Sequence, residues 1–421
     1  MLAKTGFKYR LEPTPTQLRC LRAHAGACRW LWNHFLSFRD EAYSAARAAG
    51  GAVPKGAFGY AWLCRELTLL RKTTPWLKDT SVSALQQTLR DFNQAFANFF
   101  AGTHRYPTRK KRGSDSFRVV APRDVSVDSD WVNLPKLGWV RFRLSRKIPG
   151  RVVNATVSTD GRHWFVSFCA EHGIQPGTPV GEPIGIDLGI ARSITVSDGR
   201  VFNLPVPTSR EAAFVKRLHR LVSRKTKGSA RRRRAVARLA KWRRHLANRR
   251  RDAAHKITSM LATEHREIHV EDLRLSNMTR SASGTIEEPG TNVRQKAGLN
   301  RSLLAQAHGE TIRFLEYKLP RTGGTLVKKN PAYSSQKCSE CGHIAAENRH
   351  SQAVFCCLKC ANQLNADHNA AINILEQPAG GLPVAARRRI RRKSPSESRT
   401  LLKPWNPPKG RQESAAIAHS A

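Results

Sequence analysis

Hydrophobic residues in the first hundred positions recur mostly at intervals of three, four or seven, the spacing of one helix face. They follow a short strand at 6–11 (GFKYRL) and a helix N-cap at Thr14 or Thr16. The repeating positions fall in two segments: Leu18, Leu21, Cys28, Leu31, Trp32 and Phe35, then Leu85, Leu89, Phe92, Phe96 and Phe99. The pattern predicts a helical bundle over residues 13–117 with these stripes in its core.

The pattern changes to strands after a basic segment that is rich in turn formers, RYPTRKKRGSDSF. Strand-forming residues cluster in WVNLP, WVRFRL, VVNATVST and HWFVSFCA, and Asp160–Gly161 marks a hairpin turn between the last two. We expect residues 1–12 and 118–181 to form a small β-barrel, with the helical bundle inserted between its first strand and the others.

Strands and helices mix in residues 182–376. The segment PIGIDLGIARSITVSDGRVFNL predicts three short strands with a turn at Asp198–Gly199, and EIHVEDL and GGTLVKKNP predict two more. NRSLLAQAHGETIRFLEYKL predicts one helix. Residues 210–265 predict very basic helices, because 18 Lys or Arg and one acidic residue, Glu211, lie between Arg210 and Arg251.

Four cysteines have the spacing of a zinc ribbon, which we expect over residues 336–362. Two C-x2-C pairs, Cys338/Cys341 and Cys357/Cys360, are separated by 15 residues. Four thiolates suit one tetrahedral Zn²⁺ and leave no open position, so the predicted zinc is structural. Cys356 has the wrong spacing to Cys360 and is expected to be a packing residue.

The net charge points to a polyanionic partner. The chain has 73 Lys or Arg against 31 Asp or Glu, a net charge of +42. Nucleic acid would neutralise this charge and release counterions. We expect backbone contacts from the basic helices, at Arg231, Arg232, Arg233, Arg234, Arg243 and Arg244. A sequence with no run of about 18 apolar residues and no signal peptide predicts a cytoplasmic chain without membrane contact.

Three carboxylates occupy positions where a solvated carboxylate is unusual. Asp187 lies mid-strand in IGIDLGI, and Glu271 ends the strand of EIHVEDL. Asp367 opens the last helix, where Ala371 and Ile374 share its face. An ionised side chain among apolar neighbours is costly unless a metal or hydrogen bonds compensate it. A hydrogen-bonded core aspartate is one alternative for Asp187. The order of the three elements favours an RNase H-like nuclease core, in which two Mg²⁺ ions about 4 Å apart bridge the carboxylates.

Several segments resemble one family. GIDLGIARSITVSDG, HVEDLRLSNM, GLNRSLLAQAHGETIRFLEYK and the cysteine block from NPAYSSQKC to NADHNAAINIL are similar to the TnpB (OrfB) proteins of bacterial insertion sequences, relatives of the type V CRISPR effector nucleases. FKYRLEPTPTQLRCLRAHAGACRWLWNHFL resembles the opening segment of that family. The likeness covers roughly residues 5–376.

The resemblance implies a wedge β-barrel, a helical recognition insert, and a RuvC-type core over 182–335 and 363–376 that is interrupted by a zinc ribbon. It also implies a guide RNA from the transposon end, a double-stranded DNA target cleaved beside a short motif, and catalytic roles for Asp187, Glu271 and Asp367. Two departures are Ala361–Asn362, where the family often has Gly, and a basic tail at 377–421 that we expect to be disordered.

Other functions remain open from the sequence. One is an RNA-guided DNA-binding regulator without cleavage, and another is a zinc-ribbon DNA-binding accessory of transposition. A strand-joining tyrosine transposase would need a His-hydrophobic-His triplet, which the sequence lacks. The sequence does not define an oligomeric state, although a monomer is favoured.

Overall fold

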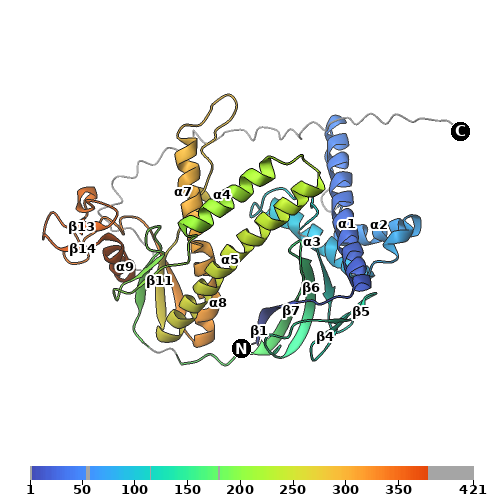
Figure 1. Ribbon diagram of the computed structural model, residues 1–421, viewed down its shortest axis with the longest axis horizontal. Coiled ribbons are helices and arrows are strands. Elements are labelled where there is room, and N and C mark those ends of the chain that lie inside the picture. The colour runs from blue at the N-terminus through green and yellow to red at the C-terminus, as the bar shows by residue number, and fades with distance from the viewer. Residues whose placement is uncertain (1, 54–56, 114, 179–180, 378–421) are drawn as a thin grey trace.

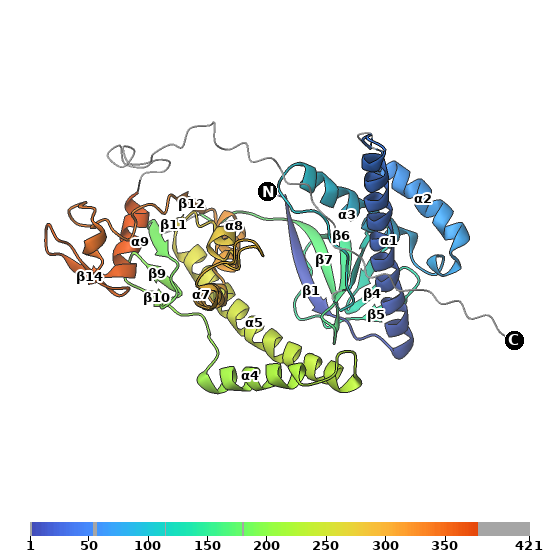
Figure 2. The ribbon, with the colours of Figure 1, turned by 90° about the horizontal axis from the view of Figure 1, so that it is seen from above.

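The computed structural model describes residues 2–53, 57–113, 115–178 and 181–377 of the 421-residue chain. The fold is α+β, with an N-terminal unit of helices and antiparallel sheets beside a C-terminal unit built on a mixed sheet (Figures 1 and 2). The tail predicted to be disordered lies outside the described residues, apart from Gln377. No described helix is long and apolar enough to cross a bilayer.

The N-terminal helices form where the hydrophobic repeat predicts them. They are α1 (Pro15–Ala48), α2 (Tyr60–Thr73), the short 3-10 helix η1 (Pro75–Leu77) and α3 (Val82–Phe100). Thr14 is the N-cap of α1, and it forms a reciprocal capping box with Gln17. The predicted stripes are buried or half-buried in the core of this unit.

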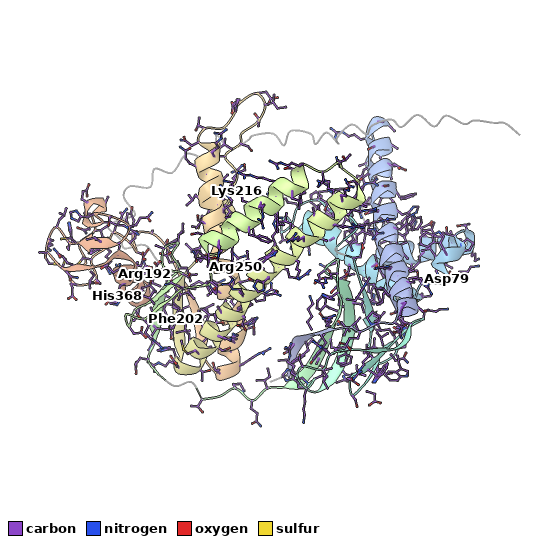
Figure 3. The ribbon with its side chains drawn as sticks, viewed as in Figure 1. Asp79, Arg192, Phe202, Lys216, Arg250 and His368 are labelled. Carbon is purple, nitrogen blue, oxygen red and sulfur yellow. The ribbon has the colours of Figure 1, made fainter. Side chains whose placement is uncertain are left out.

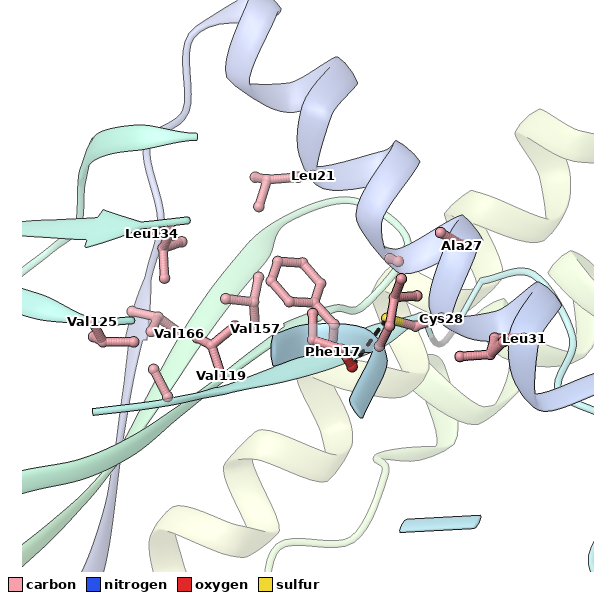
Figure 4. Packing of buried hydrophobic residues seen from close by; sticks show 14 of the residues in the cluster. Leu21, Ala27, Cys28, Leu31, Phe117, Val119, Val125, Leu134, Val157 and Val166 are labelled. Carbon is pink, nitrogen blue, oxygen red and sulfur yellow. Dashed lines mark hydrogen bonds between the residues drawn. The ribbon is translucent and has the colours of Figure 1, made fainter. Parts of the chain in front are cut away.

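The first sheet contains four antiparallel strands in the order β1-β7-β6-β2. The strands are β1 (Leu2–Arg10), β2 (Ser116–Val120), β6 (Arg151–Thr159) and β7 (Trp164–Gly173). Helix α1 packs its apolar face directly on this sheet, with Leu21 and Cys28 near Phe117 and Val157 (Figure 4). Helices and sheet therefore share one hydrophobic core.

The described residues of the N-terminal unit form two separate sheets and do not show the closed β-barrel that the sequence predicts. A second sheet holds β3 (Ser126–Asp128), β4 (Trp131–Leu134) and β5 (Gly138–Arg141). In the described residues, backbone hydrogen bonds join this sheet to the first one at the Leu11–Phe142 bridge and at the residues on either side of it. The strands of the second sheet have only three or four residues, so they are too short to continue the ladder round a barrel.

The sheet of the C-terminal unit has the order β10-β9-β8-β11-β12. Its strands are β8 (Ile184–Asp187), β9 (Ile194–Val196), β10 (Val201–Phe202), β11 (Glu267–Glu271) and β12 (Thr325–Lys329). β8, β11 and β12 are parallel, whereas β8, β9 and β10 form an antiparallel meander with the predicted turn at Asp198–Gly199.

Strand alternation gives this sheet two different faces. Ile184, Ile186, Ile268 and Val270 pack with helices α5 (Ala230–Glu264) and α8 (His308–Thr322) on one face. The other face carries the alternate positions and contacts α9 (Ala366–Glu376). A Cβ on Gly185 would lie 2.1 Å from the carbonyl oxygen of Ala371, so only glycine allows α9 to lie this close to β8.

The remaining elements are α4 (Ser209–Ser223), α6 (Leu275–Met278), α7 (Val293–Ala305), the short 3-10 helix η2 (Ala346–Asn348), β13 (Val354–Cys356) and β14 (Gln363–Asn365). Helices α4 and α5 form the predicted basic hairpin. Arg244 of α5 reaches the N-terminal unit and pairs with Asp160 at 2.9 Å, while Arg321 of α8 donates to Thr5 Oγ1 at 2.8 Å.

The prediction of one helix over NRSLLAQAHGETIRFLEYKL was wrong, because α7 and α8 are separate. Ala307 between them has a φ of 51°, outside the helical range. Two side chains at the break turn inward to the loop after β8. Gln306 donates to the Ile190 carbonyl at 2.8 Å, and His308 Nε2 lies 3.0 Å from the Gly189 carbonyl oxygen. These buried polar contacts stabilise the break in place of a continuous helix.

Candidate active site and metal ribbon

Strand register brings the first two carboxylates together. Ile184 pairs with Ile268 and Ile186 with Val270 in the parallel ladder, so Asp187 and Glu271 follow side by side at the carboxyl ends of their strands. Asp187 is the last residue of β8, and the prediction of a mid-strand position was wrong. The chain turns away after Asp187, which leaves its side chain at the edge of the sheet.

Helix α9 supplies the third carboxylate. Asn365 caps the helix and accepts a hydrogen bond from the Asp367 N–H at 3.2 Å. Ala371 and Ile374 are fully buried, as their position on the face of Asp367 predicts. Asp187, Glu271 and Asp367 all line one cavity of about 330 Å³, which also contacts Ser334, Ser335, Arg349 and Gln352. The structure therefore brings the three predicted residues together.

The cavity disfavours the ionised form of each carboxyl group when no cation is present. Burial, followed by the charges of Glu271 and Asp367, raises the pKa of Asp187 to about 7. Burial also raises the pKa of Glu271, and the Ser334 hydroxyl opposes that rise by donating to it. Burial raises the pKa of Asp367, against the effect of Arg349 and Arg192. Divalent cations would relieve this repulsion and desolvation.

The alternative role for Asp187, that of a hydrogen-bonded core aspartate, is poorly supported. The backbone N–H of Leu188 donates to Asp187 and lowers its pKa, but burial and the two neighbouring carboxylates outweigh this effect. Oxygen atoms from three carboxylates are the hard ligands that Mg²⁺ prefers. The residues present therefore fit a magnesium site.

Arg349 is a site residue that the sequence analysis missed. It comes from the ribbon, just after η2, and its Nη2 lies 3.8 Å from Asp367 Oδ1. Arg192 influences Asp367 from the loop after β8, and Figure 3 shows Arg192 near His368 at this end of the sheet. Both arginines lie in segments that carry the family resemblance, but each reaches the cavity only through tertiary packing, so the sequence did not mark them as site residues.

Two asparagines tie α9 to the base of the ribbon. Asn369 donates to the Lys337 carbonyl at 2.8 Å and accepts from the Ser339 N–H at 3.0 Å. One turn later, Asn373 donates to the carbonyls of Ser334 and Lys337 at 2.9 and 2.7 Å. Both asparagines are buried. The two asparagines lie four positions apart on the side of α9 away from Asp367 and Ala371, a side that the sequence analysis did not expect to be buried.

The four predicted cysteines converge. The sulfur atoms of Cys338, Cys341, Cys357 and Cys360 all lie within 4.8 Å of one another, as a tetrahedral thiolate site requires. Cys356 is outside this group and contacts Gln363 instead. In the turn after the last cysteine, where the family often has Gly, Ala361 adopts the left-handed backbone with a φ of 58°.

The six predicted nucleic-acid contacts do not share one environment. Arg231, Arg233, Arg234 and Arg243 are exposed on α5, and Arg232 is half-buried. Arg244 is half-buried and already paired with Asp160 of the N-terminal sheet. Among these residues, Arg232, Arg233 and Arg244 line a cavity of about 930 Å³ between α5 and the hairpin turn at 160–162.

Comparison with known proteins places the chain in a family. It is 40% identical to "Putative RNA-guided DNA endonuclease InsQ" of Escherichia coli (strain K12), over 88% of this chain and 91% of InsQ. A second relative, "Putative RNA-guided DNA endonuclease" of Streptomyces pristinaespiralis, is 31% identical over 91% of this chain and 90% of the relative. Family profiles described as "Probable transposase" and "Cas12f1-like, TNB domain" match residues 167–282 and 308–374. The chain belongs to the TnpB (OrfB) family.

Two further comparisons concern shape. A solved Cas12f1–sgRNA–target DNA complex matches with a TM-score of 0.50 and 12% identity, over 89% of this chain and 98% of the other, which supports a shared fold. A "Helix-turn-helix domain" profile matches residues 1–48. In this TnpB family member, the described part of that segment is a strand followed by one long helix, so the profile's description does not match the local structure.

We expect one zinc ion per chain, bound by the four clustered cysteines. Cys357→Ser should lose the metal and loosen the ribbon, because structural zinc contributes about 10–16 kcal/mol in isolated fingers. Elemental analysis of the purified protein measures this. Cys356→Ser is the matched control and should retain zinc. The reverse result for these two variants would contradict the ligand assignment.

The raised pKa of Asp187 predicts a pH-dependent stability in the absence of magnesium. The folded chain retains a proton that the unfolded chain releases near its ordinary pKa of 3.8, so stability is lost as pH rises through about 7. At pH 8 without magnesium, Asp187→Asn should raise the Tm by on the order of a few degrees. Magnesium should raise the Tm of the wild type more than that of the variant.

Asp272→Asn is the control for this measurement, because Asp272 is exposed and lies on the opposite side of the strand from Glu271. It should leave both the pH dependence and the magnesium response unchanged. Equal magnesium stabilisation of the wild type and Asp187→Asn would contradict the proposed site.

Proposed function

We propose that this chain is an RNA-guided DNA endonuclease that hydrolyses phosphodiester bonds at one Mg²⁺-dependent, RuvC-like site. The observation that carries the proposal is the convergence of Asp187, Glu271 and Asp367 in one cavity. The names of its relatives support the RNA guide and the DNA target. The intact set of carboxylates favours cleavage over a regulator that only binds DNA, and over a zinc-ribbon accessory protein.

The chemistry divides between the metal and the chain. Two bound Mg²⁺ ions would activate water and stabilise the leaving oxygen. Asp187, Glu271 and Asp367 would hold the ions, while the Ser334 hydroxyl orients Glu271 by donating to it. Arg349 would supply positive charge next to Asp367, where negative charge accumulates on the phosphate in the transition state.

The rest of the chain would bind and position nucleic acid. We assign residues 1–12 and 118–181 to a wedge-like domain and 13–117 to a recognition insert. Base pairing with a guide RNA from the transposon end would select the target, and the protein would read a short flanking motif. The zinc ribbon at 336–362 would fix the start of α9, because β14 leads directly into that helix. A monomer is sufficient for this scheme.

Asp187→Ala should abolish cleavage while guide and target binding persist, because it removes a metal ligand and leaves the binding surfaces intact. We expect a loss of at least on the order of 10³ in rate. Glu271→Ala and Asp367→Ala should behave alike, and a double variant should be little worse than either single one. Plasmid cleavage with the copurified RNA, with and without magnesium, measures this.

The matched control for cleavage is Asp272→Ala, which removes a neighbouring exposed carboxylate and should cleave normally. Cleavage that survives Asp187→Ala would mean that the site is wrong. Cleavage that proceeds equally well after removal of the RNA would mean that the guide mechanism is wrong. If the wild type binds the target and does not cleave it, the alternative function as an RNA-guided DNA-binding regulator is favoured.

The basic hairpin of α4 and α5 should contact a nucleic-acid backbone. Replacing Arg231, Arg232, Arg233 and Arg234 by Gln should weaken binding to all guides alike, since phosphate contacts carry little sequence information. The slope of log affinity against log salt should flatten by up to about 3. Replacing the same residues by Lys retains the charge and should retain the slope. An unchanged slope in the Gln variant would show that these arginines do not touch the backbone.

A further inference from the structure

Arg39 is a buried cation at the far end of the helical insert. It lies on α1, is 8% exposed, and is surrounded by aromatic rings. Its guanidinium carbon lies 3.8 Å from the ring centre of Phe96 and between 5.3 and 5.5 Å from those of Tyr43, Phe58 and Phe100. Such contacts with ring faces offset part of the cost of burying the charge.

The hydrogen bonding of Arg39 is incomplete. Its Nε–H is buried without a hydrogen-bond partner among the described residues, and no described carboxylate forms an ion pair with it. The adjacent carboxylate, Asp40, accepts from the Tyr106 hydroxyl instead. Its terminal nitrogen Nη2 donates to the Tyr43 hydroxyl at 3.4 Å. A buried donor without an acceptor is unfavourable, so the site suits a ligand that supplies one.

Space for that ligand exists beside Arg39. Two cavities of about 470 and 400 Å³ share Arg39, Tyr43, Val53, Phe96 and Phe100 in their linings. These volumes are in the range of sites for small ligands. Phe100 is 64% exposed and Tyr43 is 39% exposed, so their rings are accessible from solvent.

We propose that this aromatic pocket binds one unpaired nucleobase of a DNA single strand. The base would stack on the rings of Phe100 and Tyr43, with a carbonyl oxygen or ring nitrogen accepting from Arg39 Nε–H. Stacking of this kind tolerates any base. Arg47, in the lining of the smaller cavity, adds positive charge for the attached phosphate. The proposal rests on the nucleic-acid binding of the proposed function.

A nucleobase fits the pocket better than an apolar peptide. A peptide would fill the aromatic groove without supplying the negative charge that a chain of net charge +42 attracts. The helical insert lies at the opposite end of the molecule from α9 and the carboxylate cavity (Figures 1 and 2). The bound base therefore belongs to a part of the strand remote from the cleavage position, and it takes no part in hydrolysis.

Photocrosslinking locates the base. The full chain with its copurified RNA is bound to target DNA carrying 4-thiothymidine at one position at a time, without magnesium, and crosslinked peptides are identified by mass spectrometry. We expect at least one position to crosslink to Tyr43 or Phe100. Crosslinks that map elsewhere for every position of both strands would overturn the proposal.

An affinity measurement tests the stacking. At raised salt, where phosphate contacts weaken, Phe100→Ala should reduce the affinity for short single-stranded DNA by about 5- to 150-fold. An abasic site at the crosslinking position should cause the same loss in the wild type and no further loss in Phe100→Ala. Leu69→Ala, which changes another exposed apolar residue, on α2 and outside both cavities, should bind normally.

The two proposals can fail separately. Normal magnesium-dependent cleavage by the wild type, together with equal affinities of the wild type and Phe100→Ala for intact single-stranded DNA, would overturn the pocket and leave the nuclease. Competition by a proline-rich peptide without any effect of the abasic site would also overturn it. Absence of guided cleavage with an intact Tyr43 or Phe100 crosslink would instead count against the proposed nuclease alone.

Discussion

The C-terminal unit is built around one unfavourable interaction, the approach of three carboxyl groups in a partly buried cavity. Burial raises the pKa of each of them, and the charges of the other two carboxylates raise that of Asp187 further. A folded chain tolerates such repulsion only if the surrounding structure holds the groups in place. The elements around the cavity supply this constraint from several directions.

Each carboxylate is held by a different kind of contact. The parallel ladder fixes Asp187 beside Glu271, and the missing side chain of Gly185 lets α9 approach the same strand. Asn369 and Asn373 hold the helix against the segment that precedes Cys338. The cysteine ribbon and the carboxylate cavity are therefore connected, since the ribbon contributes Arg349 and its base is hydrogen-bonded to α9.

The strongly basic surface has a related cost. The positive charges of the α4–α5 hairpin repel one another. Few apolar residues oppose this repulsion where the two helices pack; the buried ones are Leu218, Ala235 and Leu239. Two ion pairs oppose part of the repulsion: Arg249–Glu211 joins the two helices, and Arg244–Asp160 attaches the hairpin to the N-terminal unit. A bound polyanion would oppose the remainder, which connects the charge of the chain to its proposed ligand.

The sequence by itself predicted most local elements, the four cysteines that cluster and the three carboxylates that line one cavity. Helix period and C-x2-C spacing are short-range properties, so the residues that carry them can be recognised without a fold. Only the tertiary structure decided the roles of Arg349, Arg192 and the asparagine pair, the break at Ala307, and the pairing of the N-terminal strands into two sheets. These features depend on contacts between segments that are distant in the chain, where no local pattern specifies the partner.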